Sequence, residues 1–250
     1  MIQTFLTDGV SVSGDILTID DDGVARHIKA ARVRSGEPLR LITQTKVYAL
    51  RAVSVQPKFE ARIEKAEPNN YAPYPVHIFM GILSPKGENE DVVAAVTQMG
   101  AASYTPLITS RVQRKSGKPI FPSPERLESA ARAACELSGR GRLPMLRHAA
   151  TLDDACKYMR RHAGFGAGPV VVMFYEDASQ CDISVHDMIA AGKDAASIMG
   201  LIGAEGGFEP EEVAQVRAAG AKIVSLGDLV MEARLAATVA CAHLVAAVER

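Results

Sequence analysis

The chain has 250 residues, of which 48% are hydrophobic, and carries a net charge of −1 at neutral pH. A chain of this size buries about 70% of the surface of its unfolded state, so it needs neither a disulfide nor a metal ion to fold. The sequence has no apolar run of the about 20 residues that cross a bilayer, and its start does not resemble a signal peptide. The cysteines are scattered without a C-x-x-C motif, which favours reduced thiols in a cytoplasmic protein and argues against a metal site. They are Cys135, Cys156, Cys181 and Cys241.

Basic residues gather in two segments although the total charge is nearly neutral. Residues 111–147 contain nine lysines and arginines against three glutamates, and residues 26–40 contain five basic residues against one acid. Segregated charge of this kind gives a neutral protein a basic face, which suits contact with nucleic acid. For any single arginine the solvated side of a helix is the simpler explanation, but two such segments together favour a nucleic-acid partner.

Residues 1–72 are predicted to form a small β-rich domain. The stretches "DILTI", "PLRLIT", "KVYALRAVSVQ" and "FEARIEKAE" alternate or cluster apolar and β-branched residues between turn formers. Gly36 in "SGEP" and the Asp22-Gly23 pair in "DDGV" are expected in tight turns. The segment "EPNNYAPYP" (67–75) is rich in proline and asparagine, and it predicts the boundary to a second domain of residues 73–250.

Strands and helices alternate after that boundary. Buried strands are predicted at "VHIFMGIL", "SYTPLIT", "GPVVVMFYED", "SIMGLIG" and "AKIVSLG". Helices are predicted at "NEDVVAAVTQMGA", at "EARLAATVACAHLVAAVER" and at "SPERLESAARAACELSGR", where Ser123 is the expected N-cap and Gly139 the expected end. Apolar strands that alternate with helices are typical of a parallel sheet covered on both faces, so the predicted fold class is α/β.

A glycine-rich stretch follows the predicted strand at 197–202. The segment "GAEGGFEPEE" (203–212) combines three glycines with an acidic helix start, and "VSLG" (224–227) ends the next strand. Ligands of parallel α/β sheets bind beyond the carboxyl ends of the strands, where glycine lets a ligand approach the backbone. The stretch has no Lys-Ser/Thr pair and no G-x-G-x-x-G motif, and it carries Glu205, so it favours a ligand without a polyphosphate. Two tight turns in a scaffold are the simpler alternative.

The segment "LIGAEGGFEPEEV", followed by "VSLG", resembles the signature of the RsmE family, the SPOUT-class methyltransferases of 16S ribosomal RNA. Ala204 stands where that signature usually has proline. The resemblance extends to "HIKAARVRSGEPLRL", to "GILSPKGENEDVVAAVTQMGAASYTPLITSRV" and to "ACELSGRGRLP", in the order of the family. It therefore covers nearly the whole chain.

The resemblance implies a PUA-like, RNA-binding domain at residues 1–72 and a SPOUT methyltransferase domain at residues 73–250. The second domain would end in a trefoil knot, an exception to the rule that chains do not thread loops. The resemblance also implies S-adenosylmethionine as the cofactor and methylation of uridine at N3 in 16S rRNA of the small ribosomal subunit. It further implies a homodimer without a metal ion.

The same resemblance implies the site residues. Residues expected to bind the cofactor are Tyr175, Glu176, Leu201, Ile202, Gly203, Glu205, Gly206, Gly207, Ser225, Leu226, Gly227 and Met231. Residues expected to contact RNA are Arg32, Arg34, Lys86, Arg111, Arg114 and Arg140. Because the sulfonium of the cofactor is already positive, the site has to align acceptor nitrogen, methyl group and sulfur, and uridine N3 has to lose its proton. No general base is evident; the catalytic candidates are Arg140, Glu232 and Arg234.

Several polar positions depart from the family pattern. The usual Arg-x-Glu-Thr-Ala stretch reads Glu232-Ala-Arg234-Leu-Ala, and Ala95, Gln98 and Leu137 replace a lysine, a glutamate and a glutamine. The exchanged charges predict either a preserved internal ion pair or altered RNA contacts and weakened catalysis. Two alternatives therefore stay open. One is a knotted RNA-binding or ribosome-assembly protein without efficient methyl transfer, and the other is a SPOUT methyltransferase of another RNA.

Overall fold

The computed structural model describes residues 3–84, 87–162 and 169–249. The chain divides into two compact units, Met1–Ala72 with Arg132–Leu143 and Pro73–Ala131 with Pro144–Arg250. None of the helices in the described part of the chain combines the length and the hydropathy that a membrane span needs.

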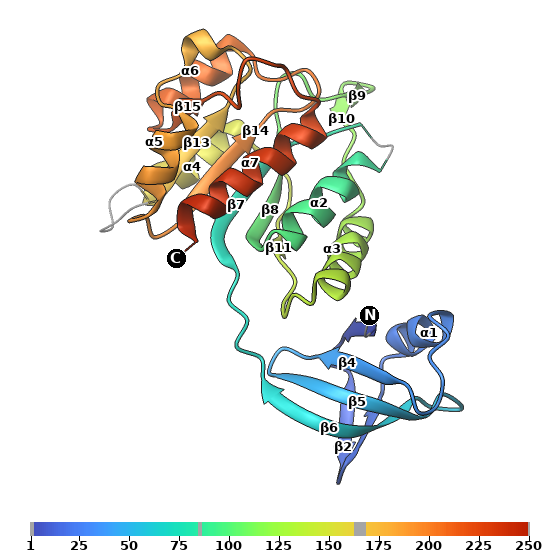
Figure 1. Ribbon diagram of the computed structural model, residues 1–250. Coiled ribbons are helices and arrows are strands. Elements are labelled where there is room, and N and C mark those ends of the chain that lie inside the picture. Colours follow the sequence, from blue (N-terminus) through green and yellow to red (C-terminus); the bar gives the residue numbers. More distant parts are fainter. Residues whose placement is uncertain (1–2, 85–86, 163–168, 250) are drawn as a thin grey trace. The chain divides into compact units, whose positions relative to one another are not determined.

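The first unit contains a mixed sheet with the strand order β1-β4-β5-β6-β3-β2 and the helix α1 (Asp22–Ala30) (Figure 1). Its strands are β1 (Gln3–Leu6), β2 (Val10–Ser13), β3 (Ile16–Ile19), β4 (Pro38–Ile42), β5 (Lys46–Ser54) and β6 (Glu60–Pro68). β1 pairs with β4 in parallel, and the other neighbours are antiparallel. Alternate residues of β5, among them Leu50 and Ala52, point into a core that α1 completes with Val24 and Ile28.

Asp22 and Gly23 begin α1, so the tight turn predicted at this pair is wrong. The carboxylate of Asp21 accepts hydrogen bonds from the N–H groups of Gly23 and Val24 at 2.9 and 3.1 Å, which caps the helix. The bond from Val24 is the main reason why the pKa of Asp21 is lowered. An aspartate followed by apolar residues at helical spacing was the sequence signal for this helix.

The second half of the helix α3 (Pro124–Ser138) and the loop after it pack within the first unit. Arg132 donates from Nη1 to the carbonyl oxygen of Leu6 at 2.9 Å, and the N–H of Leu6 donates to the carboxylate of Glu136 at 3.2 Å. Burial raises the pKa of Glu136, although Nδ1 of His27 lies 3.5 Å from its second oxygen. Residues 132–143, which the sequence analysis places in the second domain, therefore belong to the packing of the first sheet.

The second unit is built on a parallel sheet in the order β11-β8-β7-β14-β13-β15, with β12 also paired to β8. Its strands are β7 (Tyr74–Gly81), β8 (Ala101–Ile108), β11 (Met145–Leu146), β12 (Ala150–Thr151), β13 (Val170–Phe174), β14 (Ile198–Ile202) and β15 (Lys222–Val224). All residues of the central strand β14 are buried, as is typical of a parallel sheet covered on both faces. A separate hairpin of β9 (Arg114–Lys115) and β10 (Lys118–Pro119) follows β8.

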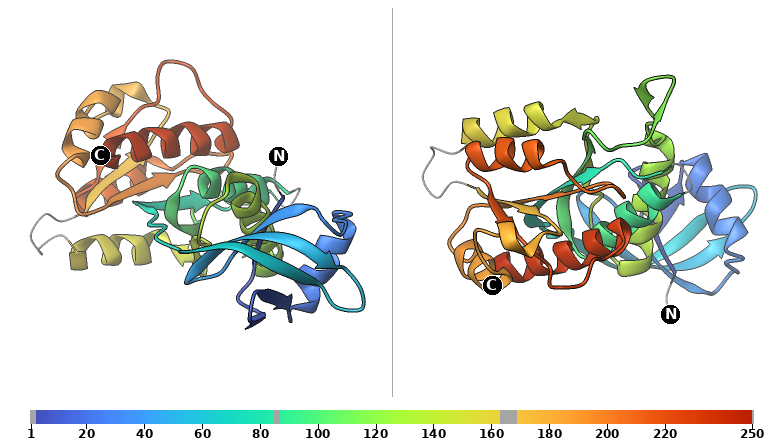
Figure 2. Two further views of the ribbon diagram at one scale, coloured as in Figure 1. Left: turned by 60° about the horizontal axis from the view of Figure 1, so that its bottom comes forward. Right: turned by 90° about the horizontal axis from the view of Figure 1, so that it is seen from above.

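Helices cover both faces of this sheet (Figure 2, right). One face carries α4 (Leu152–His162) and α6 (Pro210–Ala218); the other carries α2 (Glu88–Gln98), α5 (Val185–Gly192) and α7 (Ala233–Val248), and the short 3-10 turn η1 (Ala178–Gln180) follows β13. α7 follows the edge strand β15 in the sequence yet packs on β7 and β14 in the middle of the sheet, a return that a knotted C-terminus requires. The predicted fold class, a parallel α/β domain with a separate β-rich N-terminal sheet, is confirmed.

β7 ends where two stretches of backbone meet without a side chain between them. A Cβ atom added to Gly81 would lie 2.2 Å from the nitrogen of Ala204 and 2.7 Å from the carbonyl carbon of Gly203. Both atoms directly follow the neighbouring strand β14, and backbone cannot move aside as the end of a long side chain can. Position 81 therefore has no room for any residue but glycine.

Gly81→Ala is expected to lower the free energy of unfolding by about 3 kcal/mol, because the extra volume enters a closely packed interior. Gly220→Ala is the matched control, since Gly220 has a φ of +102° but open space where its Cβ would lie. Its cost is limited to backbone strain of about 1 kcal/mol. Denaturant unfolding of both variants measures the difference, and equal losses would show that the chain relieves the crowding at position 81.

Candidate functional site

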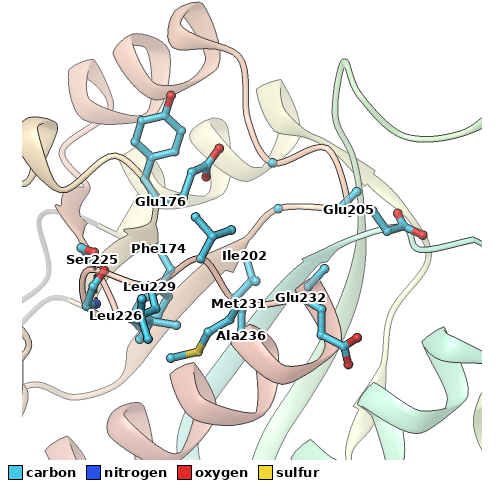
Figure 3. A pocket seen from close by; sticks show the side chains of 17 residues that line it. Phe174, Glu176, Ile202, Glu205, Ser225, Leu226, Leu229, Met231, Glu232 and Ala236 are labelled. Atoms are coloured by element: carbon cyan, nitrogen blue, oxygen red, sulfur yellow. Dashed lines mark hydrogen bonds between the residues drawn. The ribbon is translucent and has the colours of Figure 1, made fainter.

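One cavity of about 260 Å³ lies at the carboxyl ends of β13, β14 and β15 (Figure 3). Three chain segments line it: residues 174–176 at the end of β13, residues 202–207 at the end of β14 (without 206), and residues between 225 and 236 before and in the first turn of α7. This is the edge of a parallel sheet at which ligands of α/β proteins bind.

Most residues predicted to bind a ligand line this cavity. They are Tyr175, Glu176, Ile202, Gly203, Glu205, Gly207, Ser225, Leu226, Gly227 and Met231. Leu201 instead packs in the core with residues of α4 and α6, because successive side chains of β14 point to opposite faces of the sheet. Gly206 lies against the side chain of Arg111 and outside the lining.

Other lining residues were not predicted from the sequence as ligand contacts. They are Phe174, Ala204, Leu229, Val230, Glu232, Ala233 and Ala236, of which Glu232 was expected only as a catalytic candidate. Leu229 and Val230 are 84% and 81% exposed. Two apolar residues in a row just beyond a strand end, where polar residues are expected, were the available signal.

Apolar side chains and two of the three carboxylates of the lining occupy different ends of the cavity. In Figure 3, Leu226, Leu229 and Met231 lie together at one end and Glu205 and Glu232 lie at the other, while Glu176 lies apart from these two glutamates. None of the residues that line the cavity is basic. Such a lining suits a ligand with an apolar ring system and with hydroxyl or positively charged groups, and it disfavours a phosphate.

The glycine loop, residues 203–207, turns sharply beside the cavity. The N–H of Gly207 donates to the carbonyl oxygen of Ala204 at 2.9 Å, and Gly207 has a φ of +69°. A Cβ atom at this position would lie 2.6 Å from a carboxylate oxygen of Glu176. A side chain at position 207 would therefore strain the backbone and also displace the carboxylate of Glu176.

Arg111, which follows β8, fixes the outer side of the glycine loop. Its Nη1 donates to the carbonyl oxygen of Gly206 at 2.6 Å, and its Nε and Nη2 donate to the two carboxylate oxygens of Glu209 at 2.8 and 2.9 Å. These bonds lower the pKa of Glu209, the N-cap of α6, and raise the pKa of Arg111. These hydrogen bonds occupy the guanidinium group of Arg111. Arg111, which was predicted to contact RNA, therefore holds the glycine loop in place in this structure.

Three further hydrogen bonds join the ends of neighbouring strands to the chain that follows β14. Ser110 donates from its N–H and its hydroxyl to one carboxylate oxygen of Glu212, at 2.8 and 3.1 Å, and the other oxygen accepts from the N–H of Glu209 at 2.9 Å. The N–H of Ser84 donates to the carboxylate of Glu205 at 2.6 Å. The exits of β7 and β8 are thus both tied to the glycine loop and the start of α6.

Glu232 and Arg234 form an ion pair with each other, as one interpretation of their exchanged order predicts, but both side chains are exposed. Nη2 of Arg234 donates to Glu232 at 3.1 Å, and Nη1 donates to Asp91 on α2 at 2.9 Å. The bond to Asp91, followed by the bond to Glu232, raises the pKa of Arg234. The network connects α2 with the start of α7 beside the acidic end of the cavity.

The structure separates the residues predicted to contact RNA. Those with exposed side chains are Arg32, Arg34, Arg111 and Arg114, while Lys86 lies outside the described residues. Arg140 is buried; its guanidinium carbon lies 5.4 Å from the centre of the Tyr71 ring, and its Nε donates to the carbonyl oxygen of Arg142 at 2.6 Å. Arg140 therefore has a packing role in the first unit, in place of the predicted RNA contact and catalytic role.

A family model described as an RNA methyltransferase domain matches residues 70–245, which is most of the chain. The chain belongs to this RNA methyltransferase family. The resemblance noted in the sequence is thereby confirmed, and the cavity beside the glycine loop lies inside the matched domain.

Individual members of the family resemble the chain over nearly its whole length. The ribosomal RNA small subunit methyltransferase E of Mycobacterium bovis is 26% identical over 240 residues, which are 94% of this chain and 88% of that protein. The crystal structure of the protein of that name from Neisseria gonorrhoeae, bound to S-adenosylmethionine, has a TM-score of 0.75 at 21% identity and covers 97% of this chain and 96% of its own. A putative methyltransferase from Legionella pneumophila, in complex with the same cofactor, has a TM-score of 0.77 at 22% identity, with 99% and 98% covered. At these identities the solved structures establish a common fold.

Arg111→Gln is expected to loosen the glycine loop, because a glutamine side chain cannot bond to Glu209 and to the Gly206 carbonyl at once. The amides of residues 206–208 should then exchange with deuterium about tenfold faster than in the wild type, as local opening becomes easier. Arg126→Gln is the control, since it removes an exposed guanidinium that pairs with Glu90 at 2.7 Å. Unchanged exchange in Arg111→Gln would show that the loop keeps its turn without the clamp.

The bond between Arg111 and Glu209 is expected to weaken only in acid. The pKa of Glu209 lies below its ordinary value of 4.5, so the carboxylate stays charged in the folded protein at a pH that would protonate it in the unfolded chain. The stabilisation is therefore complete above 4.5 and is lost as the pH falls through the lower folded-state value. Thermal unfolding of the wild type and of Glu209→Gln should differ at neutral pH and converge in acid. A difference that persists at the lowest pH would assign the effect to another group.

Proposed function

We propose that this RNA methyltransferase uses S-adenosylmethionine to methylate N3 of a specific uridine in 16S rRNA of the small ribosomal subunit. The observation that carries the cofactor assignment is the cavity with one apolar end, one acidic end and no basic residue in its lining. The name of the Mycobacterium bovis relative supports a substrate in the small-subunit RNA, and the Neisseria gonorrhoeae structure supports the cofactor. The choice of N3 rests on the resemblance of the sequence to the RsmE family.

The lining of the cavity fits this cofactor. Leu226 and Leu229 offer apolar walls to an adenine ring, and the carboxylate of Glu176 is an acceptor for ribose hydroxyl groups. The carboxylates of Glu205 and Glu232 provide negative charge for a ligand that carries an ammonium and a sulfonium group. The open space beside Gly227, which has a φ of +130°, leaves bare backbone next to the ligand.

The residues of the chain position the reactants and accept the proton that leaves uridine N3. Bound S-adenosylmethionine supplies an electrophilic methyl group on a positively charged sulfur. The clamp of Arg111 on the glycine loop keeps one wall of the cavity fixed, and alignment of acceptor and donor in a fixed site supplies a large part of the rate. We assign to Glu232, at the acidic end, the acceptance of the N3 proton, and to Arg234, bonded to it, the positioning of that carboxylate.

A homodimer is part of the proposal. Leu229 and Val230 adjoin the cavity with most of their side chains exposed, and Leu235 at the start of α7 is 48% exposed. An apolar surface of this kind on a folded domain marks a region that another surface covers. A second copy of the chain would cover these residues and close one side of the cavity.

The test is the transfer of a labelled methyl group to small ribosomal subunits from cells that lack this protein. We expect incorporation at a single uridine, and chromatography of the digested nucleosides against N3-methyluridine identifies the modified atom. Glu232→Gln should lower the rate at saturating cofactor and RNA by about 100-fold, because general-base catalysis contributes this much. Its affinity for S-adenosylmethionine should fall by less than about tenfold, because Glu205 still offers a carboxylate to the cationic groups of the cofactor.

Other outcomes favour the alternatives. Tight binding of the cofactor without incorporation into any RNA would favour an RNA-binding or ribosome-assembly protein, and the departures at Ala95, Gln98 and Leu137 would then mark lost catalytic contacts. Incorporation into another RNA, with none in small subunits, would keep the chemistry and replace the substrate. A full rate in Glu232→Gln would remove Glu232 as the proton acceptor.

A further inference from the structure

A short hairpin extends from the end of β8 close to the glycine loop (Figure 2, right). β9 and β10 pair antiparallel around Ser116 and Gly117, whose φ values of +51° and +78° match a tight hairpin turn. The N–H of Ile120 donates to the carbonyl oxygen of Gln113 at 3.3 Å, which closes the base of the hairpin. Val112 is buried directly before it, so the hairpin has a fixed root.

The hairpin is uniformly basic and exposed. Arg114, Lys115 and Lys118 all have exposed side chains, and residues 111–124 contain no aspartate or glutamate. Neither lysine forms an ion pair with any residue that the structure describes. Unpaired lysines that project from a defined backbone present point charges to the phosphates of a nucleic acid.

An exposed aromatic side chain stands directly beyond the hairpin. Phe121 is 54% exposed, two residues after β10. An aromatic ring next to a basic strand is the arrangement with which proteins hold single-stranded nucleic acid, because the base stacks on the ring while the phosphates meet the cations. An acidic protein surface would match the lysines but would gain nothing specific from the ring.

The root of the hairpin is joined to the cofactor cavity. Arg111 precedes the hairpin by two residues and bonds both to the Gly206 carbonyl and to Glu209, while Ser110 bonds to Glu212. A short, hydrogen-bonded segment therefore connects the hairpin to the wall of the cavity. A nucleotide bound to the hairpin is held at a defined position relative to that wall.

We propose that the β9–β10 hairpin grips the backbone of an unpaired segment of the substrate RNA through Lys115 and Lys118, and that Phe121 stacks on a base of that segment. This contact presents the target uridine to the cavity. The inference rests on the proposed function for the identity of the RNA, and it goes beyond that function in naming the surface that holds the RNA.

The test compares the binding of two RNAs, isolated small ribosomal subunits and protein-free 16S rRNA, by filter retention over a series of salt concentrations. The double variant Lys115→Gln/Lys118→Gln should bind both about tenfold more weakly, with a salt slope smaller by about 1.5, since each lost phosphate contact contributes about 0.7–0.9 to that slope. Phe121→Leu should weaken binding about fivefold with an unchanged slope, because only stacking is lost.

The matched control is Lys193→Gln/Lys222→Gln, which removes the same charge from the same unit. Lys193 directly follows α5 and Lys222 begins β15, so both lie at the amino ends of the strands, whereas the cavity lies at the carboxyl ends. The control should bind RNA as the wild type does, and calorimetric titration should give all three variants the cofactor affinity of the wild type.

Three results would overturn the proposal. If the control weakens binding as much as the hairpin variant, the RNA responds to overall charge. If the hairpin variants weaken binding to subunits and leave protein-free 16S rRNA unaffected, the hairpin contacts a ribosomal protein. Unchanged binding of the hairpin variants to both RNAs would show that another surface of the protein holds the RNA. A wild type that binds RNA through the hairpin yet transfers no methyl group would instead contradict the proposed function, so the two failures are distinguishable.

Discussion

The close approach of backbone to backbone between the ends of β7 and β14 is the constraint on which the site depends. Position 81 has no space for a side chain against Gly203 and Ala204, so the strand ends lie closer together than any residue other than glycine permits. Arg111, which follows β8, holds a second point of the same loop, the Gly206 carbonyl. A turn fixed at two points gives the cavity a rigid wall made of backbone, which is what orientation of a bound reactant requires.

This arrangement separates acidic side chains from basic side chains. The carboxylates of Glu205 and Glu232 face the cavity, whereas the basic residues of the same region lie outside it, on Arg111 and on the hairpin that follows. A cationic cofactor and an anionic RNA therefore meet surfaces of opposite sign that lie a few residues apart in the chain. The pairing of Arg111 with Glu209 separates the two regions, because it neutralises a carboxylate that is bonded to the segment leading into the basic hairpin.

The sequence predicted the parts of the fold that short stretches of chain determine. The buried strand β14 and the glycine loop were predicted in place, since an apolar run followed by glycines is a local pattern. The clamp on that loop was not predicted, because Arg111 and Glu209 are 98 residues apart and meet only through the sheet. Residues 132–143 were assigned to the wrong unit for a similar reason, as the bond from Arg132 to Leu6 spans 126 residues. Alternation along β14 also excluded Leu201, a detail that residue type alone does not reveal.

The exchanged order of Glu232 and Arg234 departs from the family pattern, and a third residue, Asp91, takes part in the resulting ion pair. The two side chains bond to each other, and Arg234 also reaches Asp91 on α2, so one cation is shared by two carboxylates from different elements. Exchange within a bonded pair leaves the net charge beside the cavity unchanged, and it places the carboxylate on the lining and the guanidinium against α2. A carboxylate at the cavity is the group that removal of a proton from uridine N3 calls for. The exchange is therefore compatible with methyl transfer, and a loss of activity would have to come from positions at which charge has disappeared, such as Ala95 and Gln98.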